Sequence, residues 1–304
     1  MTAKDIPRFK LEGFRSLHRS ELPVTPFGYN QLDKARMIPG FELYSSEGLL
    51  RSTGPLKSAF YRMSLTITGT LDMQIGLEHY THEPRTVSFT YPNQIFSKWN
   101  ISPDAFGYYL LFEEDFLFDL VPSIKIPVEF PFYDPGGQPL FQLDETELEN
   151  TIQHVLRINE ELQENRSGRV RAIKMHLYLL LLEARRSYER QALHAVPDTD
   201  LVRRFRRLVA QHYMDKRQVA EYAALLAVTP NHLNRVIKQV TGNTASDMIR
   251  EMLLVETKSL LKYTTYSVSE IAYRLDFSDP GTFSRFFKKA TGETPLTYRN
   301  AASG

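Results

Sequence analysis

Two blocks near the C-terminus, residues 219–238 and 269–288, repeat one pattern of apolar and polar residues. In each block a short amphipathic segment is followed by a turn and then by a second segment whose outer face carries an arginine. These arginines, Arg235 and Arg285, stand 50 positions apart. The pattern is typical of helix-turn-helix units, whose second helix enters the major groove of DNA. The sequence therefore predicts two DNA-reading units in tandem.

The first block predicts a recognition helix that begins at Pro230. Thr229 is a suitable N-cap, and proline fits the first helical position because that position has no intrahelical N–H partner. Apolar residues at helical spacing should then face inward, leaving a polar outer face. Asparagine can bond adenine, arginine can bond guanine, and lysine meets phosphate. The predicted DNA contacts of this helix are Asn231, His232, Asn234, Arg235 and Lys238.

The second block predicts a matching helix, capped by Ser278 or Asp279, with a phenylalanine-rich inner face. Its outer face has Gly281 in place of a side chain, so we expect the first unit to carry more of the sequence specificity. Residues 245–263 between the units predict one helix close to 30 Å long. That length suits recognition helices about one DNA turn, roughly 34 Å, apart. The predicted DNA contacts of the second helix are Thr282, Ser284, Arg285 and Lys288.

The same residues resemble the signature of AraC/XylS-family transcriptional regulators. The match runs through 231–238, Asn-His-Leu-Asn-Arg-Val-Ile-Lys, and through 269–299, with the core Phe-Ser-Arg-Phe-Phe-Lys and the close Gly-Glu-Thr-Pro-Leu-Thr-Tyr-Arg in register. The resemblance implies a transcriptional regulator that binds double-stranded DNA and forms a homodimer, with a small-molecule effector in an N-terminal cupin-like domain and RNA polymerase as a further candidate partner. One departure is Asp276, where the family usually has glycine. Aspartate tolerates left-handed backbone better than most residues, so we expect the turn to form with some strain.

Charge is distributed unevenly along the chain. Residues 199–304 contain 16 Lys and Arg against 10 Asp and Glu, a formal balance of +6, whereas the first 198 residues contain 21 against 26, a balance of −5. Neutralisation of DNA phosphates requires such a basic domain, and binding of that kind weakens as salt rises. Solvated surface charge would give the same counts, so charge supports the helix-turn-helix interpretation without establishing it.

The length of 304 residues suits two domains. Pro197 interrupts the helical pattern within a short polar stretch, so we predict a sensing and dimerisation domain at 1–192, a linker at 193–200 and a DNA-binding domain at 201–304. The chain has no signal-peptide pattern and no apolar run of membrane-spanning length, which predicts a cytoplasmic protein without a membrane partner. The absence of cysteine excludes disulfides and thiolate chemistry.

The N-terminal half shows period-2 alternation punctuated by Gly and Pro, which indicates short antiparallel strands. Two helices should follow, the first with a capping box at Asp144 and Glu147 and the second over about 170–191. The apolar stripe of the second helix fits either an intrachain core or a dimer seam. We therefore predict an α+β protein in which an antiparallel β-barrel with trailing helices precedes an all-α domain with two helix-turn-helix units; the resemblance makes the barrel cupin-like.

The strand aromatics are the candidate effector contacts, with core packing as the alternative: Phe89, Tyr91, Trp99 and Tyr108. His79 and His82 lack the spacing of cupin metal ligands, so we expect them in a solvated turn and expect no metal or cofactor. No nucleophile elbow or phosphate-binding loop occurs, and we expect no catalytic residues and no enzyme. Two alternatives stay open, a ligand-independent regulator whose barrel only dimerises and a cupin-type enzyme tethered to DNA.

Overall fold

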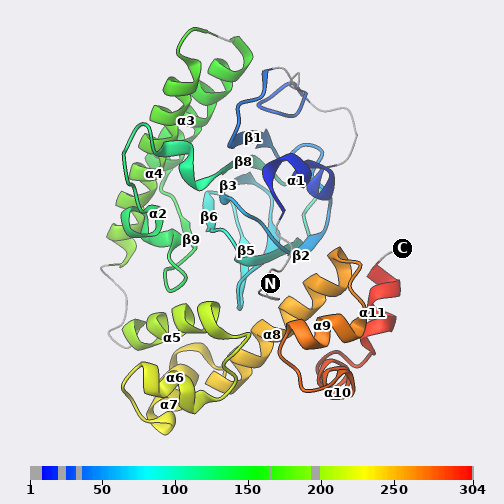
Figure 1. Ribbon diagram of the computed structural model, residues 1–304. Coiled ribbons are helices and arrows are strands. Elements are labelled where there is room, and N and C mark those ends of the chain that lie inside the picture. Colours follow the sequence, from blue (N-terminus) through cyan, green and yellow to red (C-terminus); the bar gives the residue numbers. More distant parts are fainter. Residues whose placement is uncertain (1–8, 20–24, 32–35, 165, 193–198, 303–304) are drawn as a thin grey trace. The chain divides into compact units, whose positions relative to one another are not determined.

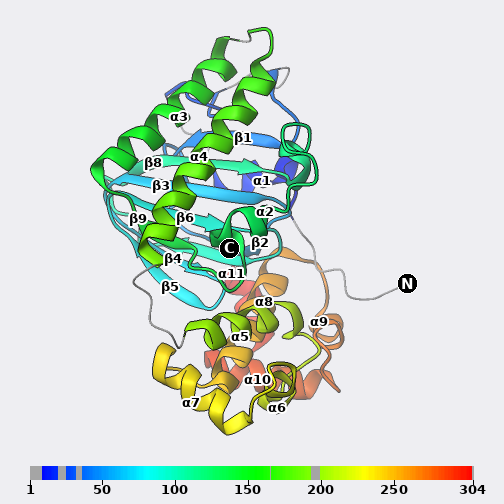
Figure 2. The same ribbon diagram turned by 90° about the vertical axis from the view of Figure 1, so that its left-hand side faces the viewer.

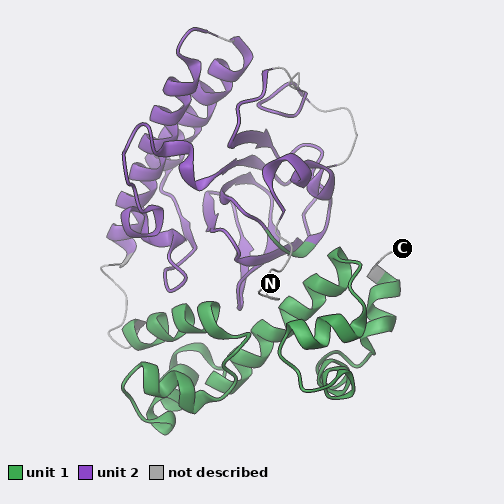
Figure 3. Ribbon diagram, in the orientation of Figure 1, with its two compact units in different colours: residues 1–8, 54–57, 196–304 green, residues 9–53, 58–195 purple. Residues whose placement is uncertain are grey.

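The structure, a computed structural model, describes residues 9–19, 25–31, 36–164, 166–192 and 199–302. The chain divides into two compact units (Figures 1 and 3). The sheet unit comprises residues 9–53 and 58–195, and the helical unit comprises mainly residues 196–304, together with the short segment 54–57. Most of the predicted linker, 193–198 of 193–200, lies outside the described residues.

Antiparallel strands form two sheets, and all of their residues except 54–57 belong to the sheet unit. One sheet has the order β1-β8-β3-β6-β9 and the other the order β2-β7-β4-β5. This confirms the predicted antiparallel β fold, although the described strands pair as two sheets and not as one closed barrel. The strands are β1 Phe41–Ser45, β2 Thr53–Lys57, β3 Tyr61–Thr68, β4 Leu71–Ile75, β5 Glu78–His82, β6 Thr86–Thr90, β7 Ile95–Trp99, β8 Phe106–Phe112 and β9 Leu140–Gln142.

Both faces of the five-stranded sheet are covered, because successive side chains point to opposite faces. On β6, Ser88 points toward the second sheet, where its Oγ lies 4.0 Å from the sulfur of Met73. The next residue, Phe89, points the other way and stacks on Phe132 with ring centroids 3.8 Å apart. That aromatic layer continues through Phe141 to Tyr188 of the long helix that follows. Successive residues of a strand such as β6 are therefore all buried, whichever face they point to.

Helices complete the sheet unit: α1 Leu11–His18, α2 Ile126–Glu129, α3 Glu145–Glu164 and α4 Arg169–Ala192. The predicted capping box is confirmed, because the Asp144 N–H donates to Glu147 Oε2 at 2.8 Å and the Glu147 N–H donates to Asp144 Oδ1 at 2.9 Å. Figure 2 shows α3 and α4 side by side across the strands. The apolar stripe of α4, including Leu177 and Leu181, is fully buried within the chain, which favours the intrachain-core interpretation of that stripe.

The helical unit contains α5 Thr199–His212, α6 Val219–Leu225, α7 Pro230–Thr241, α8 Ala245–Tyr263, α9 Val268–Arg274, α10 Pro280–Thr291 and α11 Pro295–Ala302. The predicted all-α domain with two helix-turn-helix units is confirmed. In each unit a helix of 7 residues precedes one of 12, α6 before α7 and α9 before α10. The helix predicted over 245–263 has these bounds. Within the described residues, no helix is both long enough and apolar enough to cross a membrane.

Both turns pass through left-handed backbone. Ala227 has φ 56° in the first turn and Asp276 has φ 59° in the second, where the sequence predicts this conformation. The second turn holds one residue more, 275–279 against 226–229, which is why α9 is shifted from α6 by 49 positions but α10 from α7 by 50. Aspartate tolerates left-handed backbone because its short polar side chain can hydrogen-bond locally, whereas alanine has no such compensation.

Replacing Ala227 with glycine should stabilise the helical unit by about 1 kcal/mol, because glycine adopts positive φ without a Cβ clash. Ala227 is exposed, so no packing is lost. Denaturant unfolding followed by circular dichroism measures the change. The matched control is Ala224→Gly, which is also exposed but lies inside α6 and should lose about 1 kcal/mol. Equal losses in both variants would contradict the idea that the turn is strained.

Candidate nucleic-acid interface and ligand cavity

Helix α7 buries one face and exposes the other. Thr229 caps it, accepting the His232 N–H at 3.2 Å, and Pro230 occupies its first turn, as predicted. Leu233, Val236 and Ile237 are buried. Arg235 is exposed, and its Nη2 lies 3.1 Å from His232 Nδ1. The exposed members of the predicted contact set on this helix are Asn231, His232, Arg235 and Lys238.

Asn234 is the exception on α7. It is half-buried, and its Oδ1 accepts a hydrogen bond from the Ala245 N–H at 3.0 Å, so it ties α7 to the first turn of α8. A bidentate contact with adenine needs both the amide oxygen and the amide nitrogen. Half burial and this bond restrict how Asn234 can meet a base, so in the structure it ties the two helices together, and its contact with DNA stays a prediction.

Replacing Asn234 with alanine should lower the stability of the helical unit by about 1–2 kcal/mol, because it leaves the fully buried Ala245 N–H without a partner. Sequence preference should change little. The matched control is Asn231→Ala on the exposed face of the same helix, which should stay within about 0.5 kcal/mol. Unfolding by circular dichroism and DNA titration of the same samples separate the two effects; a relaxed sequence preference at unchanged stability would contradict the structural role.

Helix α10 has the same design with a longer chain of polar contacts. Asp279 is the N-cap and accepts the Thr282 N–H at 2.8 Å, while the Thr282 hydroxyl donates to the same carboxylate at 2.7 Å. Hydrogen bonds from Thr282 lower the pKa of Asp279 to about 2. Arg285 Nη2 in turn donates to Thr282 Oγ1 at 2.9 Å. Thr282 thus positions Arg285, which is exposed together with Lys288, whereas Ser284 is half-buried.

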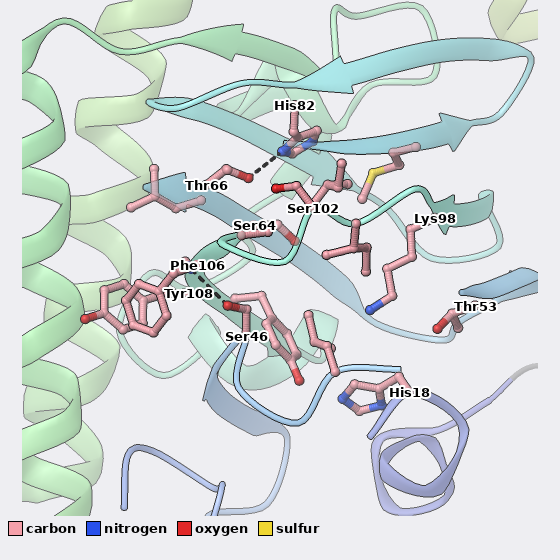
Figure 4. A pocket seen from close by; sticks show the side chains of 18 of the residues that line it. His18, Ser46, Thr53, Ser64, Thr66, His82, Lys98, Ser102, Phe106 and Tyr108 are labelled. Atoms are coloured by element: carbon pink, nitrogen blue, oxygen red, sulfur yellow. Dashed lines mark hydrogen bonds between the residues drawn. The ribbon is translucent and has the colours of Figure 1, made fainter. Parts of the chain in front are cut away.

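A cavity of about 210 Å³ lies between the two sheets of the sheet unit (Figure 4). Strands β3 and β8 line it from one side and β4, β5 and β7 from the other. Its apolar lining includes Leu71, Met73 and Phe106, and its hydroxyl groups include Ser64 and Thr66. The volume exceeds the roughly 150 Å³ that hold a benzene-sized molecule, so the cavity can accept a small organic ligand.

Two buried basic side chains are the charged groups deep in the lining of this cavity. Arg62 and Lys98 line it, and each is only 6% exposed. Burial lowers the pKa of Lys98 well below its usual value, with the positive charge of Arg62 as the next cause. Burial likewise lowers the pKa of Arg62 to about 9 and that of His82 to about 4. Burial thus disfavours the charged forms of these three side chains, and no Asp or Glu lines the cavity to balance them.

Only one of the four aromatic residues predicted as effector contacts lines the cavity. Tyr108 does so, whereas Phe89, Tyr91 and Trp99 do not. Phe89 packs on the helix side of the five-stranded sheet, and Trp99 meets His79 edge to face with ring centroids 5.7 Å apart. These three residues lie outside this cavity because alternation separates the two faces of a strand without saying which face meets the second sheet, and their contact with an effector stays a prediction.

The residues that sequence reasoning missed are the buried cations and His82. Arg62, Ser64 and Thr66 alternate along β3, and Phe96 and Lys98 alternate along β7, so a polar face opposite an apolar one was visible in the sequence. His82 was expected in a solvated turn; the structure corrects this, because His82 ends β5 fully buried, with Nδ1 3.0 Å from Thr66 Oγ1. In the described part of the chain, no group of three or more acidic, histidine or cysteine side chains is placed to hold a metal ion.

Comparison with known proteins identifies the C-terminal region. A family model described as a helix-turn-helix domain matches residues 222–301. The HTH-type transcriptional regulator GlxA of Rhizobium meliloti is 38% identical over 77 residues, which are 25% of this chain and 24% of GlxA. The HTH-type transcriptional activator RhaR of Yersinia pestis is 27% identical over 123 residues, 40% of this chain and 42% of RhaR. The chain thus spans less than half the length of the curated relatives it matches.

Among solved structures, ToxT from Vibrio cholerae is similar over a longer stretch. The two chains are 15% identical, the alignment covers 87% of this chain and all of the ToxT chain, and the TM-score is 0.43. The family model, at residues 222–301, lies within the helical unit.

Proposed function

Because the C-terminal domain is an AraC-type helix-turn-helix domain, we propose that this chain is a transcriptional regulator that binds specific DNA sequences and responds to a small molecule held in its N-terminal domain. In this proposal residues 201–304 bind DNA, residues 1–192 sense the effector and dimerise, and residues 193–200 link the two. A second copy of the chain and RNA polymerase are the proposed protein partners.

One observation carries the DNA-binding half of the proposal. Helices α7 and α10 have the same length, the same type of cap followed by proline, and an exposed arginine at the matching position, Arg235 and Arg285. An arginine on the outer face of a recognition helix can bond guanine bidentately in the major groove. Helix α8, with 19 residues, extends for about 28 Å between the two helix-turn-helix units. This length supports readout of two sites about one helical turn apart on one face of the duplex.

The predicted contacts have different proposed roles. Arg235 and Arg285 read bases, and Lys238 and Lys288 meet phosphates. His232 and Thr282 orient the two arginines, as their hydrogen bonds suggest. Asn231 is free to approach a base, and Ser284 supports the second helix at its edge. The formal charge of +6 on residues 199–304 favours approach to the polyanion and makes binding sensitive to salt.

The cavity in the sheet unit supports the sensing half of the proposal. A regulator whose N-terminal domain only dimerises needs no internal space, whereas about 210 Å³ is available between the sheets. The competing class, a cupin-type enzyme tethered to DNA, would turn over a compound bound there. The matching relatives are transcriptional regulators, which favours a role without catalysis.

Selection of bound duplexes from a random DNA pool tests the DNA-binding half directly. The full chain should enrich two short boxes with centres about one turn, roughly 10 base pairs, apart. Lys238→Ala should weaken binding about equally for all sequences and reduce the dependence on salt, because a lysine–phosphate contact carries no sequence information. If no sequence is enriched at moderate salt, whether or not small molecules are added, the proposed regulator function is wrong.

A further inference from the structure

The cavity of the sheet unit carries positive charge without a balancing carboxylate. Arg62 of β3 and Lys98 of β7 both line it and are buried, and no Asp or Glu is among the lining residues. Within the described part of the chain, neither side chain has an ion-pair or hydrogen-bond partner, and the Arg62 Nε is fully buried. An unpaired buried cation destabilises a fold, so it is expected where an anion arrives later.

The two cations are held in place by the walls of the cavity. The Arg62 guanidinium lies 3.8 Å from the centroid of the Phe96 ring and 5.1 Å from that of Phe14, so aromatic faces fix its plane. Lys98 follows Phe96 by two positions on β7 and therefore shares its face of the sheet. The positive charge of Arg62 is one cause of the lowered pKa of Lys98, after burial, so each cation makes it harder to charge the other.

Two buried imidazoles add unused polar atoms to the same cavity. His18 and His82 line it, and the Nε2 of each is buried without a partner in the described residues. The other ring nitrogen of each is engaged, Nδ1 of His18 at 2.7 Å from the Phe14 carbonyl and Nδ1 of His82 at 3.0 Å from Thr66 Oγ1. Figure 4 shows Lys98 and His82 reaching into the space from the four-stranded sheet. Because the Phe14 carbonyl only accepts, the neutral His18 ring donates through Nδ1 and leaves Nε2 as an unused acceptor, whereas the role of the His82 Nε2 depends on the tautomer of that ring.

We infer that this cavity binds a compact organic carboxylate, with Arg62 and Lys98 holding the carboxylate group and Leu71, Met73 and Phe106 surrounding an apolar body. The planar fork of arginine matches a carboxylate with two parallel hydrogen bonds. The apolar lining argues for a carbon body beside the charge, and about 210 Å³ limits that body to a ring or a short chain. The inference rests on the proposed function in one respect, that this ligand is the effector.

Isothermal titration calorimetry on the full chain without DNA tests the site. The probes are cyclohexanecarboxylate and hexanoate, each against its neutral amide, and inorganic phosphate as an anion without an apolar body. Both carboxylates should bind at one site per chain. Each amide should bind about tenfold more weakly or worse, because hydrogen bonds between charged groups are lost. Phosphate should also bind about tenfold more weakly or worse, because it has no apolar body to bury against the lining. Lys98→Met and Arg62→Met should each weaken carboxylate binding about tenfold or more, while circular dichroism confirms that both variants fold.

The matched control is Lys125→Met, the same substitution at an exposed lysine of the sheet unit, which should leave carboxylate affinity unchanged. The inference is overturned if neither carboxylate binds, if the amides or phosphate bind as well as the acids, or if both cavity variants keep the affinity of the natural chain. The comparison of acid with amide needs no variant, so it stands even if one variant does not fold. Since duplex selection without ligand tests DNA binding separately, failure of this site and failure of the proposed function are distinguishable.

Discussion

Replacing Arg235 with alanine is expected to weaken binding of the selected duplex by about 10- to 100-fold, because one bidentate contact with guanine is lost. The fold should be unaffected, since Arg235 is exposed and its one hydrogen bond, to His232, lies on the surface of α7. The loss should be much smaller on a duplex whose matching base pair has been changed. Fluorescence anisotropy at one fixed salt concentration, with both duplexes, gives the two ratios.

Two controls separate base reading from charge. Arg235→Lys keeps the positive charge but not the planar fork, so it should lose most of the specificity and little of the affinity for random DNA. Arg285→Ala makes the same change at the matching position of α10. We expect a smaller loss of specificity there, because Gly281 offers no side chain to the bases on that helix. An equal loss on all duplexes for Arg235→Ala would show that Arg235 meets phosphate and reads no base.

The helical unit was predictable from sequence because its signals are local. Each cap acts within one turn of its own helix: Thr229 accepts the N–H of His232, and Asp279 accepts that of Thr282. The bounds of α8 follow from apolar spacing and a flanking Thr244 cap. Asn234 shows the limit of such reasoning, because its bond to Ala245, eleven residues away, depends on how α7 packs against α8, which the pattern of α7 alone does not show.

The cavity was not predictable in the same way, because it depends on which faces of two sheets meet. Aromatic residues on strands look alike in sequence whether they pack under helices, as Phe89 does, or line a cavity, as Tyr108 does. Charged residues such as Arg62 and Lys98 are usually solvated, so sequence reasoning passes over them. Arg62 and Lys98 are buried because the two sheets pack face to face, and no local sequence pattern encodes that packing.

The second large effect concerns acid stability: between pH 7 and pH 4 the natural chain should lose about 3 kcal/mol more unfolding free energy than His82→Gln. Burial lowers the pKa of His82 to about 4, against about 6.5 in the unfolded chain. The unfolded state therefore takes up its proton first as pH falls. The contribution of a neutral His82 is fully present above pH 6.5 and is lost as pH falls toward 4. Guanidinium unfolding followed by Trp99 fluorescence reports on the sheet unit, because Trp99 lies there and is the only tryptophan in the chain.

Comparison between variants is needed because Glu42 acts in the opposite sense. Burial raises the pKa of Glu42 to about 7, so its protonation favours the folded state as pH falls below 7. That contribution is common to the natural chain and His82→Gln and cancels in their difference. His79→Gln is the matched control, since His79 lies on the same strand but is exposed, and it should follow the natural chain at every pH. If His82→Gln and the natural chain lose stability in parallel, His82 is not held neutral by the cavity.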